Sequence, residues 1–363
     1  IAFLLIRSQL LMLQGGESCM MSPEITIIVT PRERFSHART SLESLYAHTR
    51  VPFRLVYIDG GSPTSVREFL AERSRRWQFD LIRSERYLTP NQARNVGLSR
   101  ASTPYVVFIN NDVDVTPGWL EAMLDCARET DAAAVCPLLC VGQPLHQTIL
   151  LAGGEARIAI RVRGRQISRH LFEQRYFVGS QVADVRDRLQ RRRVEYAKLH
   201  CLLVKRDLFE RIDDMDERLL SAREHVDFSL RTTRTSAAIY VEPSAVVTYV
   251  PPQQLASSDM SYFLLRWSDE WERASQMHFQ EKWQLCEEST YLRRRLRDLG
   301  RRRREATLQP LVRRLSFGQS NAWLEGALEP VERSFNRFLS DRHRKTSYHS
   351  SESLFPSESS QAF

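Results

Sequence analysis

The sequence predicts an α/β fold in which a mostly parallel sheet carries helices on both faces. Between residues 24 and 136, short apolar runs typical of strands alternate with amphipathic stretches typical of helices. Capping residues mark the points where several of these helices begin. Repeated strand–helix–strand units favour parallel strands, and ligands bind such sheets beyond the carboxyl ends of the strands.

Five runs in this region have the length and composition of strands. They are Ile25–Thr30, Phe53–Ile58, Phe79–Ile82, Tyr105–Asn110 and Ala132–Cys136. Acidic residues stand where ligand-binding residues are expected, because Asp59 follows the second run and Asp112 follows the fourth.

The stretches between these runs have helical periodicity. In the first, Leu42 and Leu45 share one face with their apolar neighbours. In the second, Ser65 and Glu68 have the spacing of a capping box. The third opens with Thr89-Pro90, a cap followed by a first-turn proline.

The rest of the chain is less regular and then helical. Residues 137–200 are interrupted by Gly153-Gly154, and Arg186–Arg193 is basic and prone to form a helix. Strand patterns return at Cys201–Val204, Ile239–Val241 and Ala245–Tyr249, with a short helix at Asp207–Ile212. From 258 to about 340 the pattern is helical, and the serine-rich end after 345 is typical of disorder.

The charge balance is basic, with 52 Lys and Arg against 44 Asp and Glu in 363 residues. Ten arginines lie between Arg293 and Arg314, which is typical either of a solvated helix face or of a surface that attracts phosphates or anionic lipid. The run has no interleaved aromatic residues of the kind that stack on bases, so we expect no nucleic-acid partner.

Cysteine spacing and the apolar start of the chain bear on localisation. The six cysteines include no CxxC pair, and a chain of this size needs no disulfides, so we expect a reducing, cytoplasmic compartment. Residues 1–13 are apolar but too short to span a membrane, and we interpret 1–22 as a disordered leader or a truncated anchor.

Three polar clusters in the first part of the chain are candidates for chemistry. Asp59-Gly60-Gly61 suits a nucleoside against open backbone, or is an ordinary turn. Asn110–Asp114 offers oxygen ligands for a divalent cation through Asp112 and Asp114, or caps the helix that follows. Arg94 opens a helix and suits a diphosphate, or is an exposed helical arginine.

A fourth cluster, Arg223–Asp227, crowds acidic and imidazole groups at the start of a predicted helix. Glu224, His225 and Asp227 are candidates for a general base with a tuned pKa. The alternative is a helix start that favours acidic residues through its dipole.

The order of these elements resembles the family 2 glycosyltransferases, enzymes of the GT-A fold. The resemblance runs from about Glu24 to Pro252. It rests on EITIIV, VYIDGGSP, NQARNVGLSRAS, YVVFINNDVDVTPGWLEAML, CLLVKRDLFERIDDMDERLL, REHVDFSLR and YVEPSAVVTY, of which the NND block with TPGWLEAML is the most specific.

The resemblance implies a domain at 23–255, with a nucleotide-sugar half at 23–136 and an acceptor half at 137–255. A helical basic extension follows at 256–344 and a disordered tail at 345–363. It implies inverting transfer of a sugar from a nucleotide-diphosphate donor to a carbohydrate or lipid-linked acceptor. Contact with an anionic membrane, at its inner face, would suit such an acceptor.

Site residues follow from the same resemblance. Asp112, helped by Asp114, would hold Mg²⁺ or Mn²⁺ against the diphosphate, and the segment 224–227 would supply the base. Asp59 would bind the base or ribose of the donor. The remaining residues of the nucleotide-sugar site would be Thr30, Arg32, Arg94, Asn95, Asn110 and Asn111.

The chain departs from the family pattern at four places. The turn after the first strand reads Thr30–Arg34, Asn110 replaces the first aspartate of the DxD motif, and His225 replaces the usual base aspartate. Tyr249 stands where many members have a histidine near the metal. These departures leave open a non-catalytic protein that binds nucleotide sugars. A nucleotidyltransferase is disfavoured because residues 30–36 contain no glycine.

Overall fold

The structure is a computed structural model that describes residues 23–286 and 296–351, with side chains up to residue 344. The predicted leader at 1–22 and the end of the predicted tail, 352–363, lie outside the described residues. Helix α14 (Ala322–Ser351) continues seven residues past 344, where the tail was predicted to begin.

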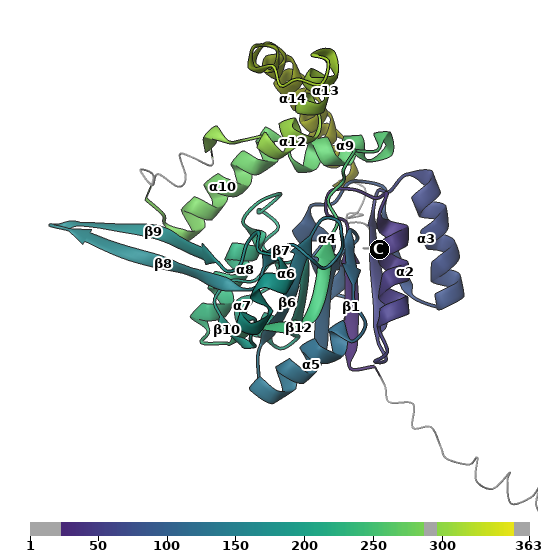
Figure 1. The fold of residues 1–363 in the computed structure, drawn as a ribbon, viewed down its shortest axis with the longest axis vertical. Helices are drawn as coiled ribbons and strands as arrows, with labels where there is room; N and C mark the ends of the chain where they lie inside the picture. The colour runs from purple at the N-terminus through teal and green to yellow at the C-terminus, as the bar shows by residue number, and fades with distance from the viewer. Residues whose placement is uncertain (1–22, 287–295, 352–363) are drawn as a thin grey trace, which may run out of the picture.

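A ten-stranded sheet forms the centre of the molecule (Figure 1). Its order is β10-β12-β6-β11-β4-β1-β2-β3, and β5 and β7 pair with β12 and β6. The strands are β1 (Ile25–Thr30), β2 (Arg54–Gly60), β3 (Asp80–Ser84), β4 (Tyr105–Asn110), β5 (Val113–Val115), β6 (Ala134–Val141), β7 (Ile149–Leu151), β10 (Arg192–Val194), β11 (Cys201–Lys205) and β12 (Ile239–Tyr249).

The first half of the sheet is parallel, as the sequence predicts. Strand β1 pairs in parallel with β2 and β4, and β2 with β3, whereas β11 runs antiparallel to β4 and β6. The carboxyl ends of β1, β2 and β4 therefore meet at one edge, which brings the segments after Thr30, Gly60 and Asn110 together. The mostly parallel fold class is confirmed.

Helices cover both faces of the sheet. Alternate residues of β1 enter two separate cores, one on each face of the sheet. Ile27 packs in the core that includes residues of α2 (Ala38–His48), α3 (Thr64–Trp77) and α5 (Trp119–Thr130). Ile28 packs in the core on the other face. That second core includes residues of α4 (Pro90–Leu98), α7 (Leu208–Ile212) and α8 (Glu224–Arg234).

The middle of the chain differs from the prediction. Residues 154–175 form a long hairpin, β8 (Gly154–Arg163) and β9 (Gln166–Arg175), which projects from the body (Figure 1). The basic segment Arg186–Arg193, predicted to be helical, contains only a 3₁₀ turn at Arg186–Arg188 and the start of β10, because Arg192 pairs with β12. The two last predicted strands are one strand, β12, with an irregularity between Glu242 and Val246.

The predicted helical extension is confirmed. It consists of α9 (Ser257–Arg266), α10 (Asp269–Trp283), α12 (Arg301–Ala306), α13 (Leu308–Leu315) and α14. Helices α10 and α12 lie above the carboxyl edge of the sheet (Figure 1). None of the described helices is long and apolar enough to cross a membrane.

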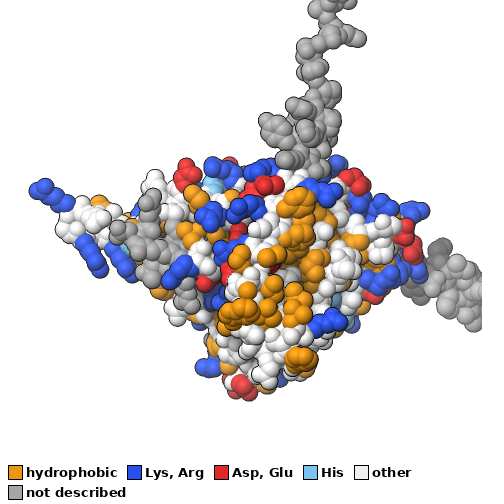
Figure 2. Space-filling view, turned by 90° about the horizontal axis from the view of Figure 1, so that it is seen from above, with side chains coloured by type: hydrophobic (Ala, Val, Ile, Leu, Met, Phe, Trp, Pro, Cys, Tyr) orange, Lys and Arg blue, Asp and Glu red, His pale blue; other side chains and the backbone are white. Residues whose placement is uncertain are grey.

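The outer surface of the extension is apolar with a basic border. Seen from above, hydrophobic side chains form a broad patch with Lys and Arg at its margin (Figure 2). Large exposed residues of α13, α14 and the turn between them are Leu311, Leu315, Phe317, Trp323, Val331, Phe335 and Phe338, which we call the apolar face. Phe317 is 99% exposed and Trp323 80%, so no described residue covers them.

Helix α4 approaches β1 so closely that Gly97 is required there. A Cβ at position 97 would lie 2.2 Å from Cγ2 of Ile28, which is 0% exposed and has no room to move.

We predict that Gly97→Ala lowers the free energy of unfolding by about 1–3 kcal/mol through overpacking. Urea unfolding of the purified variant measures this. The control is Gly326→Ala in α14, where an added Cβ meets nothing within 4 Å and alanine favours the helix. Equal stability of the two variants would contradict the close approach.

Candidate functional site

A cleft of about 730 Å³ lies beyond the carboxyl ends of the strands, under the C-terminal helices. Its lining combines the turn after β1, strand β9, the segment before β11, the start of α8 and the helices from α9 to α12. The polar lining residues are Arg32, Glu173, Arg175, Tyr196, Lys198, His200, Ser221, Arg223, Glu224, His225, Arg266, Trp267, Glu272, Gln276, Asp298, Arg301, Arg302 and Glu305.

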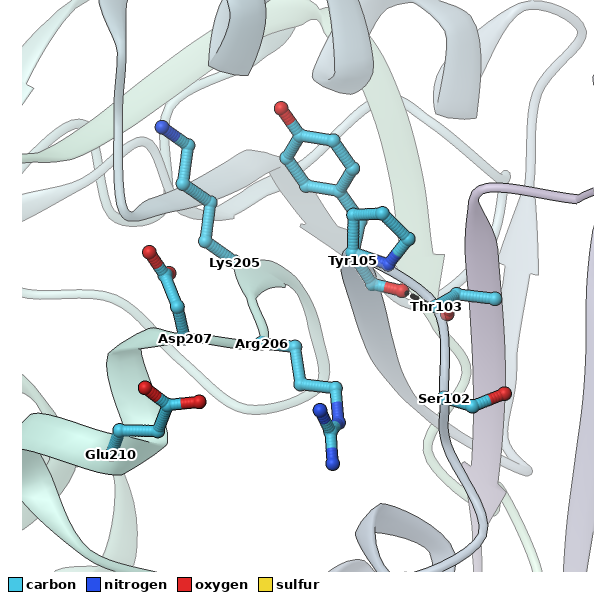
Figure 3. Close-up of a pocket in the computed structure, with 8 residues that line it drawn as sticks. Ser102, Thr103, Tyr105, Lys205, Arg206, Asp207 and Glu210 are labelled. Atoms are coloured by element: carbon cyan, nitrogen blue, oxygen red, sulfur yellow. Dashed lines mark hydrogen bonds between the residues drawn. The ribbon is translucent and has the colours of Figure 1, made fainter.

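A second pocket, of about 400 Å³, lies at the opposite end of the sheet (Figure 3). It surrounds the start of β4 and the end of β11, with Tyr105 on one side and Lys205 and Glu210 on the other. Parallel sheets bind ligands at their carboxyl ends, so we take the larger cleft as the candidate site. It also contains Arg32, Glu224 and His225, three of the residues that the sequence indicates.

Arg32 is the centre of a buried ion network. Its Nη1 lies 3.0 Å from Oε2 of Glu33 and 3.7 Å from Oδ2 of Asp112, and its guanidinium stacks over the ring of Tyr249 at 4.2 Å. Burial alone would lower the pKa of Arg32, but Glu33, Tyr249 and Asp112 raise it overall. Arg32 therefore stays charged and holds three acidic or aromatic groups together.

Glu33 joins this network to the C-terminal helices. The side chain is fully buried and accepts hydrogen bonds from Tyr249, from Nε1 of Trp267 at 3.0 Å and from Nη2 of Arg302 at 2.9 Å. Burial would raise the pKa of Glu33, but Arg32 and Arg302 lower it to about 2. The carboxylate is thus permanently ionised and ties α12 to the turn after β1.

Asp112 is a buried carboxylate without hydrogen bonds. Neither of its oxygens has a hydrogen-bond partner among the described residues, and the residue is 0% exposed. Burial raises the pKa of Asp112, Arg32 opposes the rise and Glu33 adds to it, with a net value of about 6. A buried carboxylate whose oxygens accept no hydrogen bond from the described residues fits a divalent cation, since Mg²⁺ is held by one or two carboxylates plus substrate phosphates.

Asp114 has different interaction partners from Asp112. It is part of β5, opposite Thr248 of β12, and its Oδ1 lies 2.9 Å from Nε2 of His37. No group of three or more His, Cys, Asp or Glu side chains in the described part of the chain could hold a metal by itself. A cation at Asp112 would therefore need ligands from a bound phosphate.

The asparagines of the acidic turn shape the backbone around Arg32. The amide of Asn111 donates to the carbonyl of Arg34 at 2.8 Å, and its Oδ1 accepts from the Arg32 N–H at 3.3 Å. The Thr30 hydroxyl donates to Oδ1 of Asn110 at 3.4 Å. These three predicted residues hold the turn after β1 against the turn after β4, which fixes the position of Arg32.

The other predicted nucleotide-sugar residues do not line the cleft. Asp59 accepts from the backbone and hydroxyl of Ser62 and from Arg83, at 2.5–2.9 Å. Arg94 is buried and donates to Asn91 at 2.9 Å and to the carbonyl of Leu199 at 3.5 Å, and Asn95 donates to the carbonyl of Met215 at 2.9 Å. In this structure, Asp59 thus closes its own turn, and Arg94 and Asn95 attach α4 to neighbouring segments.

Glu224 and His225 both line the cleft at the start of α8. Oε1 of Glu224 accepts from Nη2 of Arg266 at 3.0 Å, and Oε2 is buried without a partner among the described residues. Nε2 of His225 lies 2.9 Å from the Tyr196 hydroxyl. Burial, followed by Lys198 and Arg223, lowers the pKa of His225 well below its usual range, so the imidazole is neutral.

Asp227 is directed away from the cleft into a donor cluster. Its oxygens accept from Arg231 at 2.9 Å, from Lys282 at 2.8 Å and from Nε1 of Trp283 at 2.9 Å. All three donors tie α8 to itself or to α10. This geometry supports a structural role for Asp227 and leaves Glu224 and His225 as the candidate bases.

Several cleft residues carried no recognisable signal in the sequence. Lys198 and His200 lie in the segment before β11, and Arg266 and Arg302 come from the C-terminal helices. In the sequence alone, arginines of a basic helical stretch that line a site look the same as arginines on a solvent-exposed helix face. The packing of the C-terminal helices over the cleft distinguishes them. The cluster of Glu173 and Arg175 was missed together with the hairpin.

Comparison with known proteins identifies the first part of the chain. Residues 26–144, which hold β1 to β6 and the acidic turn, match the model of the glycosyl transferase family 2. The resemblance expected from the sequence is thereby confirmed for these residues.

Relatives and solved structures are more distant. The pre-mycofactocin glycosyltransferases of two Mycobacterium tuberculosis strains are 25% identical over 234 residues, which is 64% of this chain. The chain spans 44% of the length of these relatives.

A crystal structure of GalNAc-T7 with UDP, GalNAc and Mn²⁺ has a TM-score of 0.48 at 17% identity, covering 80% of this chain and 57% of that one. The structure of S. aureus TarS has a TM-score of 0.44 at 14% identity, covering 67% and 43%. Both scores are low, so the fold assignment rests on strand order and on the family match.

The raised pKa of Asp112 has a measurable effect on stability. We predict that Asp112→Asn raises the free energy of unfolding at neutral pH by about 1–3 kcal/mol, because it removes the cost of a buried, ionised carboxylate. Since the carboxyl has a pKa of about 6 in the folded protein and an ordinary aspartate has one of 3.8, the gain is full above pH 6 and fades toward pH 4. Urea unfolding across this range measures it.

The control is Asp125→Asn, whose side chain is 60% exposed and which should change stability little. A less stable Asp112→Asn at neutral pH would mean that attraction to Arg32 outweighs burial.

Proposed function

We propose that this protein is an inverting, metal-dependent glycosyltransferase that moves a sugar from a nucleotide-diphosphate donor to an acceptor hydroxyl. The observation that carries the proposal is the cleft itself. It brings Arg32, beside an Asp112 that accepts no hydrogen bond from the described residues, together with two candidate bases. The position of the cleft at the carboxyl edge of the sheet supports it further.

The donor diphosphate would bind at the Arg32 end of the cleft. Arg32 can donate two parallel hydrogen bonds to a phosphate, as guanidinium groups do. Asp112 would hold Mg²⁺ or Mn²⁺, which stabilises the charge that develops on the departing nucleotide diphosphate. The network through Glu33 keeps Arg32 in place, so little ordering is needed when the donor binds.

The acceptor hydroxyl would lose its proton to the start of α8. His225 is neutral and can accept a proton on its imidazole, and Glu224 is a carboxylate held by Arg266. Attack on the anomeric carbon from the side opposite the diphosphate inverts the configuration. The bond to the acceptor oxygen forms as the bond to the diphosphate oxygen breaks, and the base keeps the proton.

Thermal shift with UDP, GDP and dTDP, each with Mn²⁺ or EDTA, tests the donor site. We expect one nucleotide to raise the melting temperature in the presence of Mn²⁺, because a ligand that binds only the folded state stabilises it by mass action. Asp112→Ala should abolish the metal-dependent part of the shift.

A matched variant separates binding from chemistry. His225→Ala and Glu224→Gln should both keep the rise in melting temperature that the nucleotide causes. The variant that removes the true base should lower the rate of sugar transfer by about a hundredfold or more. Glu305→Gln, at the rim of the cleft, should retain both. No shift with any nucleotide would favour a protein that kept the fold without the activity.

We also propose that the apolar face rests on an anionic membrane surface, such as the cytoplasmic face of a cell membrane, where lipid-linked acceptors lie. The apolar face combines Trp and Phe with Leu and Val and is flanked by Arg313, Arg314 and Arg337, all exposed. Apolar and aromatic residues with an arginine border are the composition of helices that lie in the membrane interface.

Sedimentation with phosphatidylcholine vesicles, with and without phosphatidylglycerol, tests this surface. We expect binding that needs the anionic lipid and falls about tenfold or more in Arg313→Glu/Arg314→Glu, since each basic residue contributes about 1 kcal/mol. Ile160→Ser, which removes an exposed apolar side chain from the hairpin, is the control. Dimerisation through this face without vesicle binding would overturn the proposal.

A further inference from the structure

The cleft contains an excess of positive charge that its own carboxylates do not neutralise. Five of its seven cationic side chains have a carboxylate within 4 Å: Arg32 and Arg302 pair with Glu33, Arg223 with Glu173, Arg266 with Glu224, and Arg301 with Glu305. The remaining two are Lys198 and Arg175.

The side chains of Lys198 and Arg175 form no hydrogen bond or ion pair among the described residues. Lys198 is partly buried in the wall of the cleft. Burial, followed by Arg32 and Arg175, lowers its pKa to about 8, although Glu224 and Glu173 oppose the shift. An ammonium that has lost much of its water and faces two guanidinium groups gains strongly from an anionic ligand.

We propose that Lys198 and Arg175 bind an anionic group of the acceptor, a carboxylate or a phosphate, and that the acceptor class is therefore an acidic sugar or a sugar phosphate. This inference rests on the proposed function. The inference adds to the proposed function the class of acceptor that Lys198 and Arg175 would select.

The location of the two cations favours the acceptor over the donor. Arg175 ends β9, on the hairpin that lines the cleft and belongs to the predicted acceptor half, 137–255. Arg32 and Asp112, where the donor diphosphate is proposed to bind, belong to turns of the predicted nucleotide-sugar half, 23–136. Lys198 lies near Glu224 and Glu173, which both act on its charge, so a bound anion would hold an acceptor beside the candidate base.

An acceptor anion would also prepare His225 for proton transfer. The groups that act on this imidazole are cationic, namely Lys198, Arg223, Arg94 and Arg175, and together with burial they lower its pKa. A negative charge between Lys198 and Arg175 offsets part of this field, so the pKa of His225 rises when the acceptor binds. The base would then gain proton affinity in the complete complex.

Ligand-observed NMR on the full chain tests the inference with glucuronate, glucose 6-phosphate, inorganic phosphate and glucose as probes. We expect at least one anionic probe to bind about tenfold more tightly than glucose, as hydrogen bonds between charged groups allow. Lys198→Met and Arg175→Met should each remove most of this preference.

The matched controls remove the same charge outside the cleft. Lys205→Met lies at the other end of β11, where the ammonium pairs with Asp131, and Arg163→Met lies near the tip of the same hairpin as Arg175. Both should keep the preference for the anionic probe. An anionic probe that binds no better than glucose, or a preference that survives both cleft variants, would overturn the inference.

Nucleotide binding separates this inference from the proposed function. Lys198→Met should keep the affinity for the nucleotide diphosphate within about threefold, which corresponds to less than 1 kcal/mol. A loss of about tenfold or more would assign Lys198 to the donor diphosphate and overturn the acceptor site. If the wild type binds anionic sugars but no nucleotide, the proposed function fails and the anion site stands.

Discussion

The buried ion network around Arg32 is the interaction on which the rest of the site depends. It joins the turn after β1, the acidic turn after β4, the end of β12 and helix α12 through Arg32, Glu33, Asp112, Tyr249 and Arg302. Removing Glu33, the close partner of Arg32, would leave an uncompensated buried charge and cost about 3–5 kcal/mol. Segments separated by more than two hundred residues in sequence are thus fixed around one guanidinium.

The network also explains how this chain differs from the family pattern. Tyr249 occupies the end of β12, where many family members have a histidine, and its hydroxyl joins Glu33 and Arg302. Since the described residues contain no group of three or more His, Cys, Asp or Glu side chains that could hold a metal, a cation at Asp112 would depend more on the donor phosphates. The donor and the metal would consequently bind together, and the site would be inactive when either is absent.

The C-terminal helices are part of the site as well as a surface. Arg266 of α9 holds Glu224, Trp267 and Arg302 hold Glu33, and the face of α13 and α14 turned outward is apolar. One helical unit therefore completes the cleft on its inner side and exposes the apolar face, the proposed membrane contact, on its outer side.

The parts of the fold that follow strong periodicity could be predicted from the sequence. Strands β1 and β4 have the predicted bounds because their residues are buried on both faces, which leaves continuous apolar runs. The hairpin of β8 and β9 could not be predicted as readily, because Ile160, Val162 and Ile167 are exposed beside arginines and no core fixes them. The resemblance to the family in the sequence motifs accounts for Asp112, Glu224 and His225 as candidates. Lys198 and Arg302 could be recognised only once distant segments are packed together.

We propose above all that Asp112 holds a metal against the donor diphosphate beside Arg32. Crystals grown with the stabilising nucleotide and Mn²⁺, measured for anomalous scattering of manganese, test this most directly. We expect a peak within bonding distance of a carboxylate oxygen of Asp112 and of the diphosphate, with Arg32 in contact with the phosphate. A nucleotide bound without manganese, with Arg32 still against Asp112, would contradict it.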